Sequence, residues 1–330
     1  MKSSGSIAIV GGESLIGREL RELASEEKLA SRIKLIGVDE TAVTLTEMDG
    51  EPAVMTPLDE ENLRECGFVV LAGSAASSRK ALGMTAGRRG GPVLVDLTYV
   101  TEEEPSARLR APMVEPPGFA VPARALHVIA HPAAIALALF LLRLGAEFKL
   151  RRASAHIFEP ASERGHAGLE ELRRQTVNLF SFQPLPKTVF DAQASFAMLA
   201  RYGDDAPQSL ESIELRIERH LATLLAGQGA APMPSIHLLH APVFHGYSIS
   251  AWVEFESRPE ESEIAAALSS PEVDVRGQDL EPPNNVGVAR QSGIAVGGIT
   301  PDRNHACACW FWIVADNLRL MAENALMVVR

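Results

Sequence analysis

The sequence predicts an α/β protein of two domains: an N-terminal domain on a parallel, doubly wound sheet, and an α+β domain with a mostly antiparallel sheet. Three observations lead to this prediction. The chain has 330 residues, more than one ordinary core usually takes. Its N-terminal part alternates short β-branched runs with helical stretches, and strands that are apolar on both faces are typical of parallel sheets. From Ser235 onward, strand-like segments dominate.

The N-terminal elements follow the order of a Rossmann-like domain that runs from residue 1 to about residue 130. Four strands and one helix are expected in it, at Ser6–Val10, Arg32–Val38, Gly67–Ala72, Pro92–Asp96 and, for the helix, Leu15–Glu26. Buried strands that alternate with helices pair in parallel. The four prolines between Pro112 and Pro122 mark a connecting segment.

The second domain is expected over residues 131–312. Its expected helices are Ala133–Leu144, Gly168–Phe180 and Ile213–Leu225, and its expected strands are Arg151–Phe158, Ser235–Phe244, Gly246–Glu256 and the stretch around Ala306–Val314. A last amphipathic helix, Ala315–Val329, starts from Asp316 and is expected to complete the N-terminal domain.

Composition and charge exclude several classes of protein. The formal net charge of −11 is unsuited to nucleic acid or an anionic membrane as the main partner, because both select basic surfaces. The longest apolar run, Ala133–Leu142, is about half the length of a membrane span. The start, MKSSGSIAIVGG, does not read as a signal peptide, and three cysteines provide no disulfide framework. We therefore expect a cytoplasmic protein.

A glycine turn between the first strand and the first helix suits phosphate binding by helix N-terminal amides. Its spacing is Gly-x-x-Ser-x-x-Gly, so Ser14 stands where the dinucleotide fingerprint has its middle glycine, and its Cβ crowds a pyrophosphate. A tight turn without a ligand is the alternative, and this motif alone leaves both interpretations open. The candidate cofactor-binding residues are Gly11, Gly12, Ser14, Leu15, Ile16, Gly17, Asp39 and Gly73.

Two acidic residues at the end of the second strand indicate which dinucleotide would bind. Asp39 stands where a carboxylate bonds a ribose hydroxyl, and Glu40 follows it. Together they would repel a 2′-phosphate. NAD is therefore favoured over NADP as the cofactor.

Three segments resemble aspartate-semialdehyde dehydrogenases. Trp310–Leu326 (WFWIVADNLRLMAENAL) is similar to the family's closing helix, and Gly168–Thr176 (GLEELRRQT) is similar to its helix after the active-site loop. His240–Ser248 is similar to its Arg-x-Pro-Val-x-x-Gly-His-Ser strand. The resemblance implies an NAD(P)-dependent oxidoreductase that acts on an aldehyde in amino-acid biosynthesis, and a homodimer formed through the sheet of the second domain.

The resemblance also implies a catalytic cysteine that this sequence lacks. In the family, the thiolate of an Asn-Pro-Asn-Cys turn attacks the aldehyde, and the resulting thioester is cleaved by phosphate. The matching stretch is Ile129–Ile135, with Ala134 at the position of the nucleophile. A methyl group cannot form the covalent intermediate.

The other positions that the family uses in its reaction differ as well. The orienting glutamine matches Glu159, the substrate-carboxylate arginine matches His240, and the general-base histidine matches Tyr247. The segment that supplies a phosphate-binding arginine ends here in Glu102. We therefore expect that this chain does not catalyse the family reaction. We expect it to be retained as a dimeric module that binds a nucleotide, a protein, or a small molecule in the altered pocket.

Two alternatives keep an activity. One is hydride transfer to a carbonyl without a covalent intermediate, with Tyr247 or His131 as proton donor. The other is a metal-dependent enzyme that uses His131, Glu159 and His240, because two histidines and a carboxylate are a common ligand set. The preferred interpretation assigns no metal.

Overall fold

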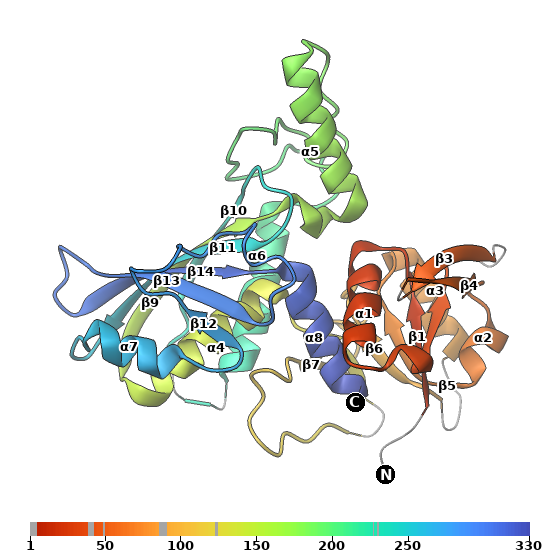
Figure 1. Ribbon diagram of the computed structural model, residues 1–330, viewed down its shortest axis with the longest axis horizontal. Coiled ribbons are helices and arrows are strands. Elements are labelled where there is room, and N and C mark those ends of the chain that lie inside the picture. Colours follow the sequence, from red (N-terminus) through yellow and green to blue (C-terminus); the bar gives the residue numbers. More distant parts are fainter. Residues whose placement is uncertain are drawn as a thin grey trace. The chain divides into compact units, whose positions relative to one another are not determined.

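The computed structural model describes residues 5–38, 43–48, 50–85, 91–122, 125–226, 228–229 and 231–330. The chain forms two compact units (Figure 1). Unit 1 comprises Met1–Ala130 and Met321–Arg330, and unit 2 comprises His131–Leu320. Among the described residues, no helix is both long enough and apolar enough to cross a membrane.

Unit 1 is built on an eight-stranded sheet in the order β3-β4-β2-β1-β5-β6-β8-β7. All neighbouring strands pair in parallel except β3 and β4, which form an antiparallel hairpin. The strands are β1 (Ser6–Val10), β2 (Ile33–Ile36), β3 (Thr44–Met48), β4 (Glu51–Thr56), β5 (Cys66–Leu71), β6 (Val93–Asp96), β7 (Ala107–Arg110) and β8 (Leu126–Ile129). The helices are α1 (Leu15–Glu26), the 3-10 turn η1 (Ala30–Arg32), α2 (Glu60–Arg64) and α3 (Ala75–Thr85).

The central strands of unit 1 are buried on both faces, as a parallel sheet requires. Val10, Ile36, Val69 and Leu71 belong to one apolar cluster of this sheet. The helix α1 starts where the Ser14 hydroxyl accepts a hydrogen bond from the Gly17 amide, which satisfies one amide that the helix itself leaves unpaired. The Ser14 hydroxyl also donates to the carbonyl of Ala72, directly after β5, so the carboxyl ends of β1 and β5 both lie beside the start of α1.

Unit 2 is built on a six-stranded, mostly antiparallel sheet in the order β10-β9-β11-β14-β13-β12, in which β9 pairs with β10, and β12 with β13, in parallel. Its strands are β9 (Leu150–Glu159), β10 (Ser235–His240), β11 (Tyr247–Phe255), β12 (Val273–Val275), β13 (Ile294–Pro301) and β14 (Ala308–Ala315). Its helices are α4 (Pro132–Glu147), the 3-10 turn η2 (Ala161–Arg164), α5 (Gly165–Phe180), α6 (Leu210–Leu225) and α7 (Glu261–Leu268), and α8 (Asn317–Val329) begins in this unit.

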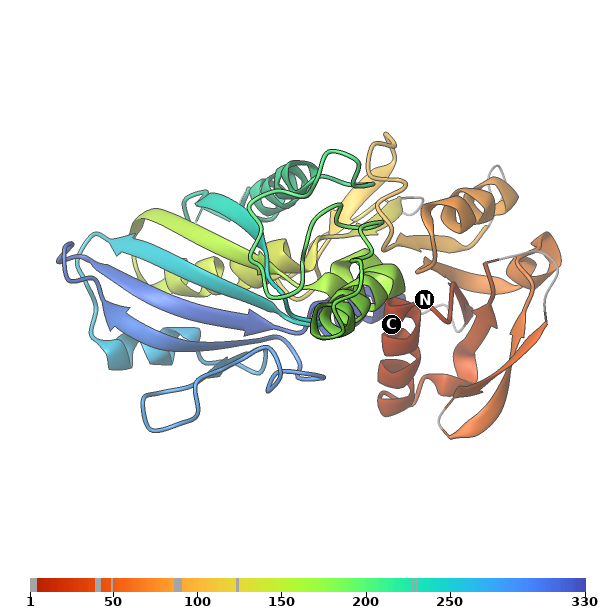
Figure 2. The ribbon, with the colours of Figure 1, turned by 90° about the horizontal axis from the view of Figure 1, so that it is seen from above.

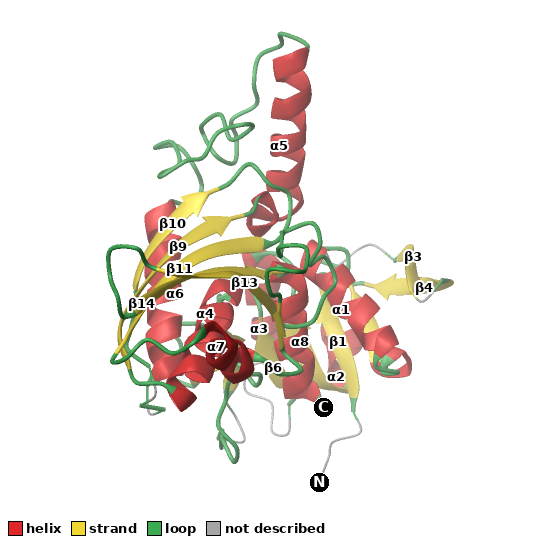
Figure 3. Ribbon diagram, turned by 60° about the vertical axis from the view of Figure 1, so that its left-hand side comes forward, coloured by secondary structure: helices red, strands yellow, loops and turns green. Residues whose placement is uncertain are grey.

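The sheet of unit 2 has one face covered by helices. Alternate residues of β9, namely Ala153, Ala155 and Ile157, are buried on this face. The helix α4, which is apolar almost all round and buried along its first ten residues, contacts α6 and α7 there (Figure 3). By contrast, α5 projects away from the sheet, as Figures 1 and 3 show, and Figure 2 shows this helix nearly along its axis.

The predicted fold class is confirmed: a parallel-dominated sheet and a second, mostly antiparallel sheet are both present. Several boundaries differ for local reasons. The strand expected to reach Phe244 ends at His240, because Pro242 cannot donate to a sheet. The helix α6 starts earlier than expected, at Leu210, because Ser209 caps it. The β3–β4 hairpin, α2, α3, β7, β8, α7, β12 and β13 were not predicted.

Candidate functional site

The topology of unit 2 brings the predicted pocket residues to one end of its sheet. Glu159 ends β9 and His240 ends the parallel strand β10, and these two residues are partners in the register. Tyr247 begins the antiparallel strand β11, so it starts at the edge where the other two strands finish. Ala134 lies in the first turn of α4. All four side chains are fully buried.

A hydrogen-bonded chain links Glu159 to His240 through a tyrosine that the sequence did not single out. The Tyr202 hydroxyl donates to Glu159 Oε1 at 3.1 Å and lies 3.1 Å from His240 Nδ1. Since the single hydroxyl proton goes to Glu159, Nδ1 must carry the proton of the imidazole. Nε2 is then a bare acceptor, and it has no hydrogen-bond partner among the described residues. Arg164 completes the chain, with Nη2 3.2 Å from Glu159 Oε1.

Burial determines the protonation states of the side chains in this hydrogen-bonded network. It lowers the pKa of His240 to about 4, with a further contribution from the Arg164 guanidinium, so the imidazole is neutral at neutral pH. Burial raises the pKa of Glu159, while Arg164 and the Tyr202 hydroxyl oppose that rise. Burial and Glu159 together raise the pKa of Tyr202, which therefore keeps its proton.

Glu163 is the centre of a second set of contacts in this buried cluster, with Asn317 and His131. Its Oε1 accepts from Asn317 Nδ2 at 2.7 Å, and its Oε2 lies 3.6 Å from His131 Nε2. Burial and the neighbouring Glu159 carboxylate raise the pKa of Glu163 to about 7, against the effect of Arg164. This carboxyl group therefore exchanges a proton near neutral pH.

His131 has a structural role at the start of α4. Its Nδ1 accepts from the Ala133 amide at 3.3 Å, so it caps the helix, and its Nε2 faces Glu163. Burial lowers the pKa of His131, with contributions from His220 and two arginines. Nδ1 thus accepts a hydrogen bond and Nε2 carries the proton of the neutral ring, close to Glu163. The role of His131 as a proton donor stays a prediction.

The geometry does not support the metal-dependent alternative. His131 faces Glu163, whereas Glu159 and His240 are joined through Tyr202. Among the residues that the structure describes, no group of three or more His, Cys, Asp or Glu side chains could hold a metal ion.

No cysteine of unit 2 lies at this end of its sheet. Cys66 begins β5 in unit 1, and Cys307 precedes β14. Cys309 pairs with Val253, whereas Tyr247 pairs with Ala315, six residues further along β14. At roughly 3.4 Å per residue, this places Cys309 about 20 Å from the cluster.

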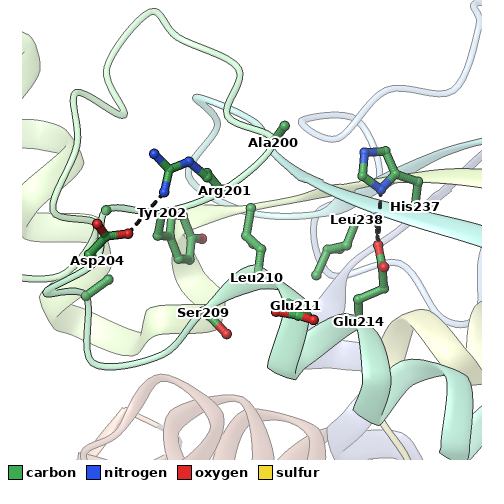
Figure 4. A pocket seen from close by; sticks show the side chains of 12 residues that line it. Ala200, Arg201, Tyr202, Asp204, Ser209, Leu210, Glu211, Glu214, His237 and Leu238 are labelled. Atoms are coloured by element: carbon green, nitrogen blue, oxygen red, sulfur yellow. Dashed lines mark hydrogen bonds and ion pairs between the residues drawn. The ribbon is translucent and has the colours of Figure 1, made fainter.

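A cavity of about 380 Å³ lies beside the start of α6 (Figure 4). Five acidic or basic side chains line it, and four of them form two pairs: Arg201 with Asp204 at 3.0 Å, and His237 with Glu214 at 3.3 Å. The fifth is Glu211. Tyr202 lines this cavity and also contacts Glu159 and His240. The cavity thus borders the buried cluster but contains neither Ala134 nor Tyr247.

The glycine turn of unit 1 is explained in part by packing alone. Gly11 has φ +87°, and a Cβ on it would lie 2.3 Å from the Cα of Gly73, so these two residues let the turns after β1 and β5 approach. A Cβ on Gly12 would make only ordinary contacts. The packing of the protein therefore does not require glycine at this position. The absence of a side chain on Gly12 leaves room for a ligand.

The start of α1 retains donors for a phosphate. Leu15 and Ile16 are the first two residues of α1, and their amides have no acceptor within the helix. The Ser14 hydroxyl turns inward and donates to the Ala72 carbonyl at 2.6 Å. The Glu13 carboxylate pairs with Arg18 and Arg21. Asp39 and Glu40 lie outside the described residues.

The turn that precedes Glu102 is stabilised by Asp96. Its two carboxylate oxygens accept from the amides and hydroxyls of Thr98 and Thr101, at 2.7–2.8 Å. No basic side chain occurs between Asp96 and Glu102. This turn therefore supplies no arginine for a phosphate.

Sequence reasoning missed Glu163, Arg164, Tyr202 and Asn317. Glu163 and Arg164 follow the buried Ser162 directly, yet in the sequence they look like solvated loop residues. Only the fold shows that each is paired with a buried group. Asn317 carried a signal, because it belongs to the segment that resembles the family's closing helix.

Comparisons with known proteins identify relatives of this chain. Residues 141–320 match the family model described as "Semialdehyde dehydrogenase, dimerisation domain". A USG-1 protein homolog of Azotobacter vinelandii is 27% identical over 318 residues, which cover 95% of this chain and 93% of that protein. An aspartate-semialdehyde dehydrogenase of Rickettsia bellii is 23% identical over 329 residues, with coverages of 95% and 93%.

A solved structure has the same fold along nearly the whole chain. The probable aspartate-semialdehyde dehydrogenase from Pseudomonas aeruginosa superposes with a TM-score of 0.85 at 25% identity, covering 98% of this chain and 96% of that one. The family model spans more than half of the present sequence. The chain therefore belongs to the semialdehyde dehydrogenase family, as a relative of the aspartate-semialdehyde dehydrogenases.

Proposed function

We propose that this protein is a homodimeric, nucleotide-binding member of its family that does not catalyse the family's phosphorylating oxidation of an aldehyde. One observation carries this proposal: Ala134, at the position of the nucleophile, is fully buried in a cluster that contains no thiol. Without a thiolate there is no thiohemiacetal, and hence no thioester for phosphate to cleave. The decisive test is an assay of that reaction, with the semialdehyde, phosphate and NAD(P).

The residues of the glycine turn fit a dinucleotide. The amides of Leu15 and Ile16 would receive a phosphate, and the bare backbone at Gly12 would let it approach. The inward hydroxyl of Ser14 removes part of the crowding that its Cβ causes. The nicotinamide, when bound, would supply a hydride acceptor. We propose NAD rather than NADP, because Asp39 and Glu40 follow β2 in the sequence.

Calorimetric titration should show weak binding of NAD and still weaker binding of NADP. Asp39→Ala should narrow the preference for NAD over NADP. A carboxylate beside a 2′-phosphate is repulsive, so removing the carboxylate favours the binding of NADP. Asp59→Ala serves as a control of equal charge change, since Asp59 caps α2 by accepting from the Asn62 amide. Tighter binding of NADP than of NAD by the unchanged protein would contradict this proposal.

The homodimer is proposed to form through unit 2. Most of the large apolar residues on the strands that we expected to form the interface face the core instead: Ile249, Val253, Phe255, Phe311 and Ile313 are buried in this unit. Trp310 is the exposed exception, at 38%. Light scattering should give a mass near twice 35.5 kDa, whereas a mass near 35.5 kDa would refute the dimer.

A second candidate function is non-covalent reduction of a carbonyl, and the Glu163 carboxyl favours it. With a pKa of about 7, this group could give a proton to the carbonyl oxygen as a hydride reaches the carbon. His131 and Tyr247, the donors that the sequence suggests, would not be needed. Small aldehydes and ketones should then oxidise NAD(P)H, and Glu163→Gln should abolish the reaction while nucleotide binding persists. Equal rates in both proteins would exclude Glu163 as the donor.

A further inference from the structure

Three buried polar atoms near the ends of β9 and β10 have no hydrogen-bond partner in the part of the chain that the structure describes. They are His240 Nε2, Glu159 Oε2 and Arg164 Nε. The His240 and Glu159 side chains are both 0% exposed, so bulk solvent does not reach these atoms. A buried polar atom without a hydrogen bond destabilises a fold, and native proteins contain few of them. The three atoms therefore point to a group that the protein binds.

The three side chains belong to one connected network. Glu159 Oε1 lies 3.2 Å from Arg164 Nη2 and accepts from the Tyr202 hydroxyl at 3.1 Å. The same hydroxyl lies 3.1 Å from His240 Nδ1. Glu159 and His240 thus each use one polar atom inside the network, while the other polar atom of the side chain has no protein partner. Ligand sites typically contain a few convergent polar atoms of this kind.

His240 cannot turn to satisfy Nε2 within the protein. Its backbone pairs with Leu199 in both directions, at 2.9 and 3.0 Å, and with β9 on the other side. Its ring lies against Phe190, with centroids 4.7 Å apart, and against Tyr202, with centroids 5.5 Å apart. The acceptor at Nε2 is therefore held in place before any ligand arrives, which lowers the entropic cost of binding.

The three atoms specify which chemical group fits them. The bare imidazole nitrogen and the carboxylate oxygen accept hydrogen bonds, whereas the guanidinium N–H donates. A group that meets all three needs both a donor and an acceptor, as a hydroxyl or a carboxamide has. A carboxylate has no donor, and an ammonium has no acceptor. A cation is also disfavoured because the Arg164 guanidinium already pairs with Glu159.

We propose that His240 Nε2, Glu159 Oε2 and Arg164 Nε bind an uncharged ligand through a hydroxyl or carboxamide group. By the family resemblance, His240 stands at the position of an arginine that holds a substrate carboxylate. The altered pocket of this chain thus selects a hydrogen-bond donor where the family selects an anion. The inference rests on the proposed loss of the family reaction and adds the class of ligand that replaces the substrate.

Four probes with the same three-carbon skeleton separate the ligand classes: propane-1,3-diol, malonamide, malonate and 1,3-diaminopropane. Nitrogen-15 NMR of the histidine rings in the unchanged protein reports on Nε2 directly, because its signal moves when it accepts a hydrogen bond. His240 is recognised by its proton on Nδ1, whereas the buried His131 and His220 accept at Nδ1. The diol or malonamide should shift the His240 Nε2 signal at concentrations at least about 10-fold lower than malonate or the diamine. The stronger of these two probes identifies the ligand as an alcohol or an amide.

The variant His240→Phe removes the acceptor and keeps an aromatic ring beside Phe190. Saturation-transfer NMR on the probe signals should show that this variant no longer binds the uncharged probes. His156→Phe, at an exposed histidine of β9, is the matched control and should bind them as the unchanged protein does. Thermal melting checks that both variants fold, and the titration of the unchanged protein decides the matter if His240→Phe does not.

An His240 Nε2 signal that no probe shifts would overturn the inference. Binding of malonate or of the diamine at equal or lower concentrations than the uncharged probes would overturn it as well. A loss of binding in His156→Phe as large as in His240→Phe would place the probes elsewhere, with the same consequence. These results leave the proposed loss of the family reaction standing, because it rests on Ala134. Turnover of aspartate semialdehyde by the unchanged protein would overturn both.

Discussion

Purified protein supplied with aspartate semialdehyde, phosphate and either NAD or NADP should react at least about 10⁴-fold more slowly than an ordinary enzyme of this type. The reason lies in Ala134, whose methyl group provides no nucleophile. The turn that ends at Glu102 also lacks the arginine that would hold phosphate. Formation of NAD(P)H is the measurement, with an enzyme of established activity assayed in parallel. A turnover number of ~1–1000 per second would refute this expectation.

The variant Ala134→Cys separates the loss of the nucleophile from the change of its surroundings. Ala134 is fully buried, and burial in apolar surroundings raises the pKa of a thiol and so suppresses the thiolate. Tyr247 stands where the family has its general base, and the His240 imidazole is a weak base with a pKa of about 4. We therefore expect the variant to remain inactive. Recovery of ordinary turnover would show that only the cysteine had been lost.

The elements predicted well were those whose pattern is local. The helices α1, α5 and α6 have apolar residues at helical spacing, and β1 and β5 are uninterrupted apolar runs. The hairpin of β3 and β4 was missed because Pro52 lies within it and because Leu45 and Val54 face solvent. A strand with little burial has no hydrophobic period to detect.

The candidate site was predicted in its position but not in its electrostatics. Glu159, His240 and Tyr247 meet because the sheet brings their strand ends together, as the family resemblance implied. The pairing of Arg164 with Glu159, and of Glu163 with His131, depends on contacts between segments that a pattern along the chain does not encode. Phe180, Phe182 and Phe196 show the reverse case, because phenylalanines that a sequence would place in a core are exposed here.

The proton on Glu163 should make stability depend on pH in a way that one substitution can isolate. The pKa of Glu163 is raised to about 7 in the folded protein, by burial and by Glu159, whereas its ordinary value is 4.5. Between these values the folded state holds a proton that the unfolded state has lost. Unfolding then releases a proton, so the contribution of Glu163 to stability falls as pH rises from 4.5 to about 7.

Comparison of Glu163→Gln with the unchanged protein removes the effects of the groups that do not interact with Glu163. The buried His131 and His240 have lowered pKa values, so their contribution is lost as pH falls below 6.5, in the opposite direction. These contributions cancel when the two proteins are compared, because both retain the histidines. A neutral amide keeps the bond to Asn317 but does not titrate. The unfolding free energy of Glu163→Gln minus that of the unchanged protein should therefore rise by about 3 kcal/mol between pH 4.5 and pH 7. Urea denaturation at a series of pH values measures it, and a difference that is constant with pH would show that folding does not raise the pKa of Glu163.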